Sequence, residues 1–105
     1  MMQRVAFKMQ LLPGHQEEYK RRHATIWPEL QQLLKESGVS DYSIFLDVAT
    51  GTLFACQKVA EGAGSQDLGS NPIVQKWWDY MADIMVTHPD RSPESVMLEE
   101  VFYLE

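Results

Sequence analysis

The order of hydrophobic periods along the 105-residue chain constrains its fold more than any other feature of the sequence. Four segments have the composition and spacing of β-strands, and two have the three- and four-residue spacing of amphipathic helices. The strand-like segments are residues 5–11, 42–46, 53–59 and 97–104, and the helix-like segments are residues 15–36 and 71–85. The resulting order predicts an α+β domain of the split βαβ type, with an antiparallel sheet and two helices on one face. The length suits a single domain over residues 1–105.

One proline lies inside the first helical pattern. Pro28 lacks a backbone N–H and its ring clashes with the preceding turn of a helix. We therefore expect either a kink or the end of one helix and the start of another, around residues 24–27. The second helix has a clearer start, because Asn71 is a good N-cap and Pro72 suits the first helical position. The glycine-rich residues 61–66 before it predict a loop or a weak helix start.

The composition excludes several classes of function. Nine Lys and Arg against fifteen Asp and Glu give a formal charge of −6, which argues against nucleic acid as a partner. A single cysteine, Cys56, allows neither an internal disulfide nor a cysteine pair for zinc, and its place in a strand predicts burial. The chain starts without an apolar signal core, and no apolar run could span a bilayer. These features predict a cytoplasmic protein that does not enter membranes.

Two residues of the first helix could carry chemistry. Tyr19 and His23 are four apart, so a helix places them on one face. The ordinary pKa of histidine lies near neutrality, which suits proton transfer in both directions, and the Tyr19 hydroxyl can bind a sugar or carbonyl oxygen. The alternative is that both are core residues with satisfied polar ends. A shared metal is not expected, because eight residues of helix separate His15 from His23 by ~12 Å.

Two further pairs lie on the predicted helices. Trp77 and Trp78 point about 100° apart, so we expect one to face the sheet and the other to line a pocket or an interface. Both could also be core residues. Arg21 and Arg22 predict a solvated helix flank or a contact with an acid of a partner.

These groups occur together in segments that resemble the L-rhamnose mutarotase family. The resemblance covers most of the chain in the expected order and departs from the family in residues 60–74, which are glycine-rich here. The matching segments are residues 17–23 (Glu-Glu-Tyr-Lys-Arg-Arg-His), 26–30 (Ile-Trp-Pro-Glu-Leu), 38–47, 75–78 (Gln-Lys-Trp-Trp), 88–90 with 92–93, and 100–104.

The resemblance implies a fold, an assembly and an activity. It implies a ferredoxin-like α+β fold, a dimeric α+β barrel in which two sheets face each other, and interconversion of the α and β anomers of L-rhamnose. It places the catalytic acid on His23 and sugar contacts on Tyr19, Tyr42, Trp77 and Trp78. Mutarotation moves protons while one C–O bond opens and closes, so no cofactor or metal is expected.

Two other functions suit the same pattern, because a fold alone does not fix a function. A dimeric α+β-barrel monooxygenase would also use a small pocket with histidine and tryptophan, and would consume oxygen with an aromatic substrate or bind haem. A non-catalytic sugar-binding module would bind rhamnose without accelerating anomer exchange. In either case the apolar last strand favours a homodimer, because an exposed apolar edge invites pairing.

Overall fold

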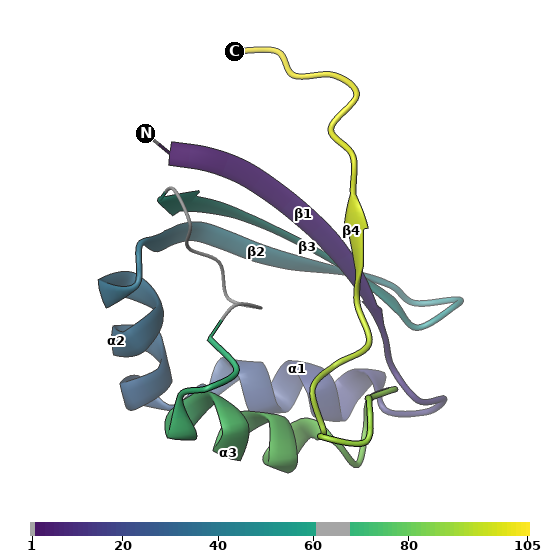
Figure 1. Cartoon of the computed structure of the whole chain (residues 1–105). Coiled ribbons are helices and arrows are strands. Elements are labelled where there is room, and N and C mark those ends of the chain that lie inside the picture. The colour runs from purple at the N-terminus through teal and green to yellow at the C-terminus, as the bar shows by residue number, and fades with distance from the viewer. Residues whose placement is uncertain (1, 61–67) are drawn as a thin grey trace.

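The computed structural model describes residues 2–60 and 68–105. The elements follow the order β1 (Met2–Gln10), α1 (Gln16–Ala24), α2 (Pro28–Glu36), β2 (Val39–Asp47), β3 (Thr52–Ala60), α3 (Pro72–Met81) and β4 (Val96–Leu98). The sheet order is β2-β3-β1-β4 and every neighbouring pair is antiparallel. The helices lie on one side of this curved sheet, as Figure 1 shows. The predicted α+β class and split βαβ topology are therefore confirmed.

The core lies between the sheet and the helices. Along β3, residues alternate between buried and exposed, so that Leu53, Ala55 and Val59 face the helices. The antiparallel register places Phe7 of β1 opposite Ala55 and Met9 opposite Leu53, which continues the buried face across the sheet. The opposite side of the sheet, which we call the outer face, is not covered by any element of the described chain.

Pro28 divides the first helical pattern into two helices. α1 ends at Ala24, and α2 begins at Pro28, where the missing N–H costs no helical hydrogen bond. The expectation that one helix ends and another starts around residues 24–27 is therefore confirmed. The layer that covers the sheet holds three helices instead of the two expected. Asn71 caps α3 as predicted, since its side-chain oxygen accepts a hydrogen bond from the backbone N–H of Ile73 at 2.9 Å. The predicted loop at residues 61–66 lies outside the described residues.

Two predictions about the sheet are wrong. The last strand spans only Val96–Leu98, instead of residues 97–104, because residues 99–105 turn away from β1 after Leu98 and pair with no other strand of the described chain. Cys56 is exposed, because it points to the outer face of β3 between the buried Ala55 and Gln57. Both differences concern surfaces that this single chain leaves uncovered.

Candidate active site

A cavity of about 860 Å³ lies between the helices and the helix-facing side of the sheet. This volume is within the range of small-molecule sites, roughly 300–1,000 Å³. The five predicted site residues all line it, although they come from α1, β2 and α3: Tyr19, His23, Tyr42, Trp77 and Trp78. Apolar side chains such as Ile26, Leu30 and Ile44 form much of the remaining wall. The cavity thus combines one imidazole and two phenols with a mostly apolar lining.

His23 is held by contacts on two sides. Its ring stacks on Tyr19, with centroids 4.2 Å apart, and meets Trp77 edge-on at 5.4 Å. The Nδ1 atom lies 3.2 Å from the backbone oxygen of Tyr19, one helical turn earlier. A carbonyl oxygen only accepts hydrogen bonds, so Nδ1 carries the proton in this contact. Nε2 is then the ring nitrogen that can accept a proton from a ligand.

Burial changes the acidity of both polar groups on α1. Desolvation lowers the pKa of His23 below its ordinary value, and the hydrogen bond with Tyr19 only partly opposes this. Burial raises the pKa of the Tyr19 phenol, with a smaller contribution from nearby Tyr42. At neutral pH the site therefore contains a neutral imidazole and a protonated phenol. The imidazole can act as a base, and the phenol can donate a hydrogen bond.

Tyr42 reaches the cavity because of an irregularity in β2. Ser40 pairs with Lys58 and Ser43 with Cys56, so two residues of β2, Asp41 and Tyr42, oppose a single residue of β3. This is a β-bulge, and Asp41 within it has a φ of 48°. Side chains alternate along a strand, so the extra residue places Tyr42 on the helix-facing side, where strict alternation from Val39 would point it outward.

Both tryptophans line the cavity, where the family resemblance places them, whereas their spacing alone predicted one toward the sheet and one toward a pocket or an interface. Trp77 is buried and belongs to the core while also meeting His23, and Trp27 packs edge-on against it at 5.1 Å. Trp78 is half-buried and packs over Gly69, where an added Cβ would lie 2.7 Å from the indole ring. The cavity extends over two sides of α3, so side chains about 100° apart can both reach it.

Arg22 has a role that the sequence did not reveal. We expected a solvated flank or a contact with an acid of a partner, but Arg22 is 8% exposed and joins α1 to the end of α3. Its guanidinium donates to Glu18, to the backbone oxygen of Tyr80 at 2.7 Å and to both carboxylate oxygens of Asp83. It also lies over the Tyr80 ring, with the guanidinium carbon 4.5 Å from the ring centroid. The only available signal was the spacing of Glu18 and Arg22 by one helical turn, which cannot predict a contact 61 residues away.

Sequence analysis also missed several polar residues of the cavity wall. Lys20 of α1, Gln31 and Lys35 of α2, and Ser40 and Asp41 of β2 line it together with the predicted residues. Polar residues are common on the faces of helices and strands that meet water, so their types and spacing gave no signal for a site.

Two further properties of the described residues bear on other kinds of site. Among residues 2–60 and 68–105, no three His, Cys, Asp or Glu side chains are grouped as ligands of a metal ion. In the same residues, no helix combines the length and apolar character needed to cross a bilayer. The described geometry defines a class of protein: a small α+β domain with one histidine in an aromatic pocket, of a volume that suits a small molecule and with an imidazole that can exchange protons.

The chain belongs to the L-rhamnose mutarotase family. The family model described as L-rhamnose mutarotase matches residues 4–104. An L-rhamnose mutarotase of Formosa agariphila is 62% identical over 104 residues, which cover 99% of this chain and 100% of the relative. The L-rhamnose mutarotase of Bacteroides thetaiotaomicron is 61% identical, with the same coverage. The resemblance deduced from the motifs is therefore confirmed.

Solved structures support the same fold. The crystal structure of an L-rhamnose mutarotase from Formosa agariphila matches with a TM-score of 0.91 and 60% identity, over 98% of this chain and 99% of that chain. A Pseudomonas aeruginosa protein of 11% identity matches with a TM-score of 0.57 over 96% of this chain and 94% of that one. The second similarity concerns the fold alone.

Proposed function

We propose that this protein interconverts the α and β anomers of L-rhamnose, with His23 as the group that transfers protons. Family membership and relatives named L-rhamnose mutarotase support the reaction. The observation that carries the proposed mechanism is the position of His23, whose Nδ1 is engaged by Tyr19 while the ring lines the cavity.

The reaction follows from a neutral imidazole at this place. Nε2 of His23 takes the proton of the anomeric hydroxyl, the bond between the anomeric carbon and the ring oxygen breaks, and the ring oxygen receives a proton. The open-chain aldehyde then turns about the adjacent C–C bond and closes on its other face by the reverse steps. The imidazolium formed first can return its proton to the ring oxygen, so one histidine can serve both transfers. General acid–base catalysis of this kind contributes typically 10²–10⁴-fold.

The remaining predicted residues bind the sugar in this proposal. The hydroxyls of Tyr19 and Tyr42 orient sugar oxygens, and the raised pKa of Tyr19 keeps its phenol protonated as a donor. Trp77 and Trp78 offer flat apolar faces, which suit the C–H side of a pyranose and the methyl group of a 6-deoxy sugar.

The test is the anomer exchange rate of L-rhamnose, measured by saturation-transfer NMR. We expect His23→Ala to reduce the enzymatic rate by about 10²–10⁴-fold. His15→Ala is the matched control, because His15 is a histidine outside the cavity lining. An unchanged rate for His23→Ala would remove His23 from the mechanism. Rhamnose binding without accelerated exchange by the unaltered protein would instead favour a sugar-binding module.

The pH dependence tests the state of the histidine. Because the neutral imidazole is the base and its pKa is lowered, we expect the enzymatic rate to persist below pH 6.5 and to fall only as His23 becomes protonated. The spontaneous rate at each pH is subtracted. An acidic midpoint at or above the ordinary histidine pKa would contradict this assignment.

We also propose that the protein acts as a cytoplasmic homodimer in which the outer faces of two sheets meet. The outer face carries exposed Phe45 and Phe54 on β2 and β3 and Val96 and Leu98 on β4, which an isolated chain would leave in water. Light scattering at micromolar concentration should give about twice the 12.1 kDa mass of one chain. The single thiol is compatible with a reducing compartment.

A further inference from the structure

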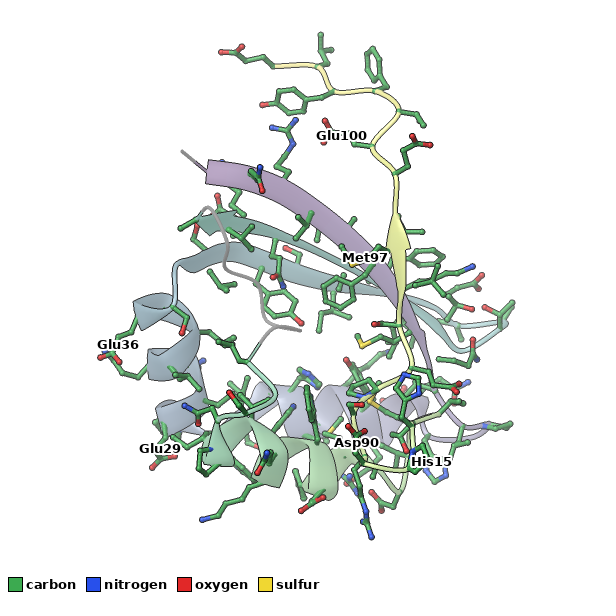
Figure 2. All side chains as sticks on the ribbon, in the orientation of Figure 1. His15, Glu29, Glu36, Asp90, Met97 and Glu100 are labelled. Carbon is green, nitrogen blue, oxygen red and sulfur yellow. The ribbon has the colours of Figure 1, made fainter. Side chains whose placement is uncertain are left out.

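One aromatic ring next to the candidate active site has no role in the proposed mechanism. Trp27 belongs to the Trp-Pro-Glu segment that joins α1 to α2, and it is not among the described residues that line the cavity. Its side chain is partly buried and packs against the core. Glu29 of the same segment is exposed and lies on the side of α2 away from the sheet, as Figure 2 shows. The segment therefore directs its tryptophan into the protein and its glutamate into solvent.

The backbone of Trp27 is restricted by the proline that follows it. A residue before proline favours extended conformations, and Trp27 has a φ of −62° and a ψ of 132°. Its carbonyl oxygen accepts hydrogen bonds from the backbone N–H groups of Leu30, at 3.0 Å, and Gln31, at 3.1 Å, which begin α2. The direction in which the indole leaves the main chain is thus fixed by the local sequence around Pro28.

The indole of Trp27 packs against Trp77. The two rings meet edge-on, with centroids 5.1 Å apart and planes at 85°. Trp27 also stacks on Tyr80 at 5.7 Å, and Tyr80 contacts Trp77 at 5.6 Å. Trp77 in turn meets His23 edge-on at 5.4 Å, with planes at 88°. The four rings therefore form a continuous chain of contacts from the exposed Tyr80 to the histidine of the cavity.

The orientation of the His23 ring depends on what packs around it. The torsion that turns an imidazole has a broad and roughly two-fold preference, so the covalent geometry alone does not select one orientation. Tyr19 covers one face of the ring, and its backbone oxygen engages Nδ1. Trp77 supplies the edge-on contact. Its indole keeps that position only while the space around it is filled, because protein interiors are closely packed.

We propose that Trp27 is a positioning residue for the anomer exchange: it holds Trp77 against His23, so that Nε2 of the imidazole points at the ligand. This inference rests on the proposed function, in which His23 transfers the protons, and adds what keeps that ring in place. Removal of the Trp27 indole leaves a void beside Trp77. Trp77 can then move into the void and water can reach His23, so the imidazole loses its orientation although the residue itself is intact.

Two NMR measurements on a Trp27→Leu variant test this role. Saturation transfer gives the kcat of anomer exchange, and a pH titration of the histidine ring signals gives the pKa of His23, whose signal is the one that is absent from His23→Ala. We expect kcat to fall by about ten-fold to 10²-fold, because a misplacement of about 1 Å can cost 10²-fold. The pKa of His23 should rise toward its ordinary value, since burial is the larger cause of its lowering.

Leu33→Ala is the matched control for a general loss of stability. Leu33 is a partly buried apolar residue of α2 that packs against the core, and it is not among the described residues that line the cavity. Its truncation should lower the melting temperature and leave both kcat and the His23 pKa unchanged. Trp27→Phe keeps an aromatic ring beside Trp77, so it should restore most of the kcat that Trp27→Leu loses.

The outcomes separate this inference from the function on which it rests. A kcat or a His23 pKa of Trp27→Leu equal to that of Leu33→Ala would overturn the positioning role. If Trp27→Leu does not fold, Trp27→Met takes its place in the same comparison, because the longer methionine side chain fills irregular gaps. A raised His23 pKa in Trp27→Leu, together with an unaltered protein that does not accelerate anomer exchange, rejects the proposed reaction but not the dependence of His23 on Trp27.

Discussion

Replacing Arg22 by methionine should weaken the attachment of α1 to α3. The methylene groups of arginine pack on neighbouring apolar surface, and methionine preserves most of that contact. What disappears is the set of polar contacts made by the guanidinium. Among these, the hydrogen bond to the Tyr80 backbone oxygen, at 2.7 Å, involves a charged donor and contributes roughly 1.5–3 kcal/mol.

The ion pairs of Arg22 contribute less than those of a fully buried pair. The Asp83 side chain is 68% exposed and that of Glu18 is 33% exposed, so both carboxylates regain water when the guanidinium is removed. The free energy of unfolding should therefore fall by about 2–4 kcal/mol. This is somewhat less than the roughly 3–5 kcal/mol typical of breaking a buried pair. A domain of this size should then melt roughly 10–20 °C lower and remain folded at 25 °C.

Thermal unfolding followed by circular dichroism at one protein concentration measures this effect. Arg21→Met is the matched control, because Arg21 is exposed and binds the same Glu18 carboxylate. Arg22→Lys keeps the charge but cannot form the forked contacts, so it should lie between the methionine variant and the unaltered protein. If Arg22→Met melted at the same temperature as Arg21→Met, the Arg22 cluster would not be what holds α1 to α3.

Three further predictions concern the cavity wall. Gly69→Ala places a Cβ where the Trp78 ring lies, so the indole must move, and rhamnose should bind several-fold more weakly by NMR titration if Trp78 contacts the sugar. Unchanged affinity would exclude that contact. Deleting Asp41 removes the bulge and should turn Tyr42 outward, so rhamnose binding should be lost. Asp41→Gly should preserve binding, because it keeps the extra residue and glycine accepts a positive φ. Equal affinities for the two variants would refute the role of the bulge. Tyr19→Phe removes a hydrogen bond donor and should raise the KM for rhamnose about ten-fold. A KM equal to that of the unaltered protein would exclude a hydrogen bond between the Tyr19 hydroxyl and the sugar.

The parts of the fold that depend on local chemistry were predictable from the sequence. Alternating apolar and polar residues identified β1, and the cost of Pro28 inside a helix predicted either a kink or a helix boundary where α1 ends and α2 begins. The residues of the candidate site were predicted from the motifs shared with the L-rhamnose mutarotase family. Their spacing alone was not sufficient, because it also allowed a simple role in the core. Their arrangement around one cavity is consistent with the family motif, and their roles stay predictions.

What could not be predicted depends on contacts between distant segments. Arg22 meets Asp83 only after α1 and α3 pack together, and residue spacing contains no information on such a pair. The shortened β4 and the exposed Cys56 would have a common cause in the proposed homodimer. Apolar residues predict burial, but burial by a second chain and burial by the same chain leave the same pattern in a sequence. Residues 97–104 therefore predict a strand of full length, while the strand of one chain, Val96–Leu98, includes only two residues of that range.

The bulge in β2 explains how so short a chain can form a cavity on one face of its sheet and an apolar surface on the other. A strand with strict alternation would assign Tyr42 and Ser40 to the same side, and the cavity would lose its second phenol to the outer face. The extra residue at Asp41 shifts the alternation once, so Tyr42, Ile44 and Leu46 face the helices while Phe45 faces outward. The inner face can then form a ligand cavity, and the outer face keeps an apolar surface, which the proposed homodimer would cover. A single strand residue in an unusual conformation therefore allows 105 residues to provide a cavity on one side of the sheet and an uncovered apolar surface on the other.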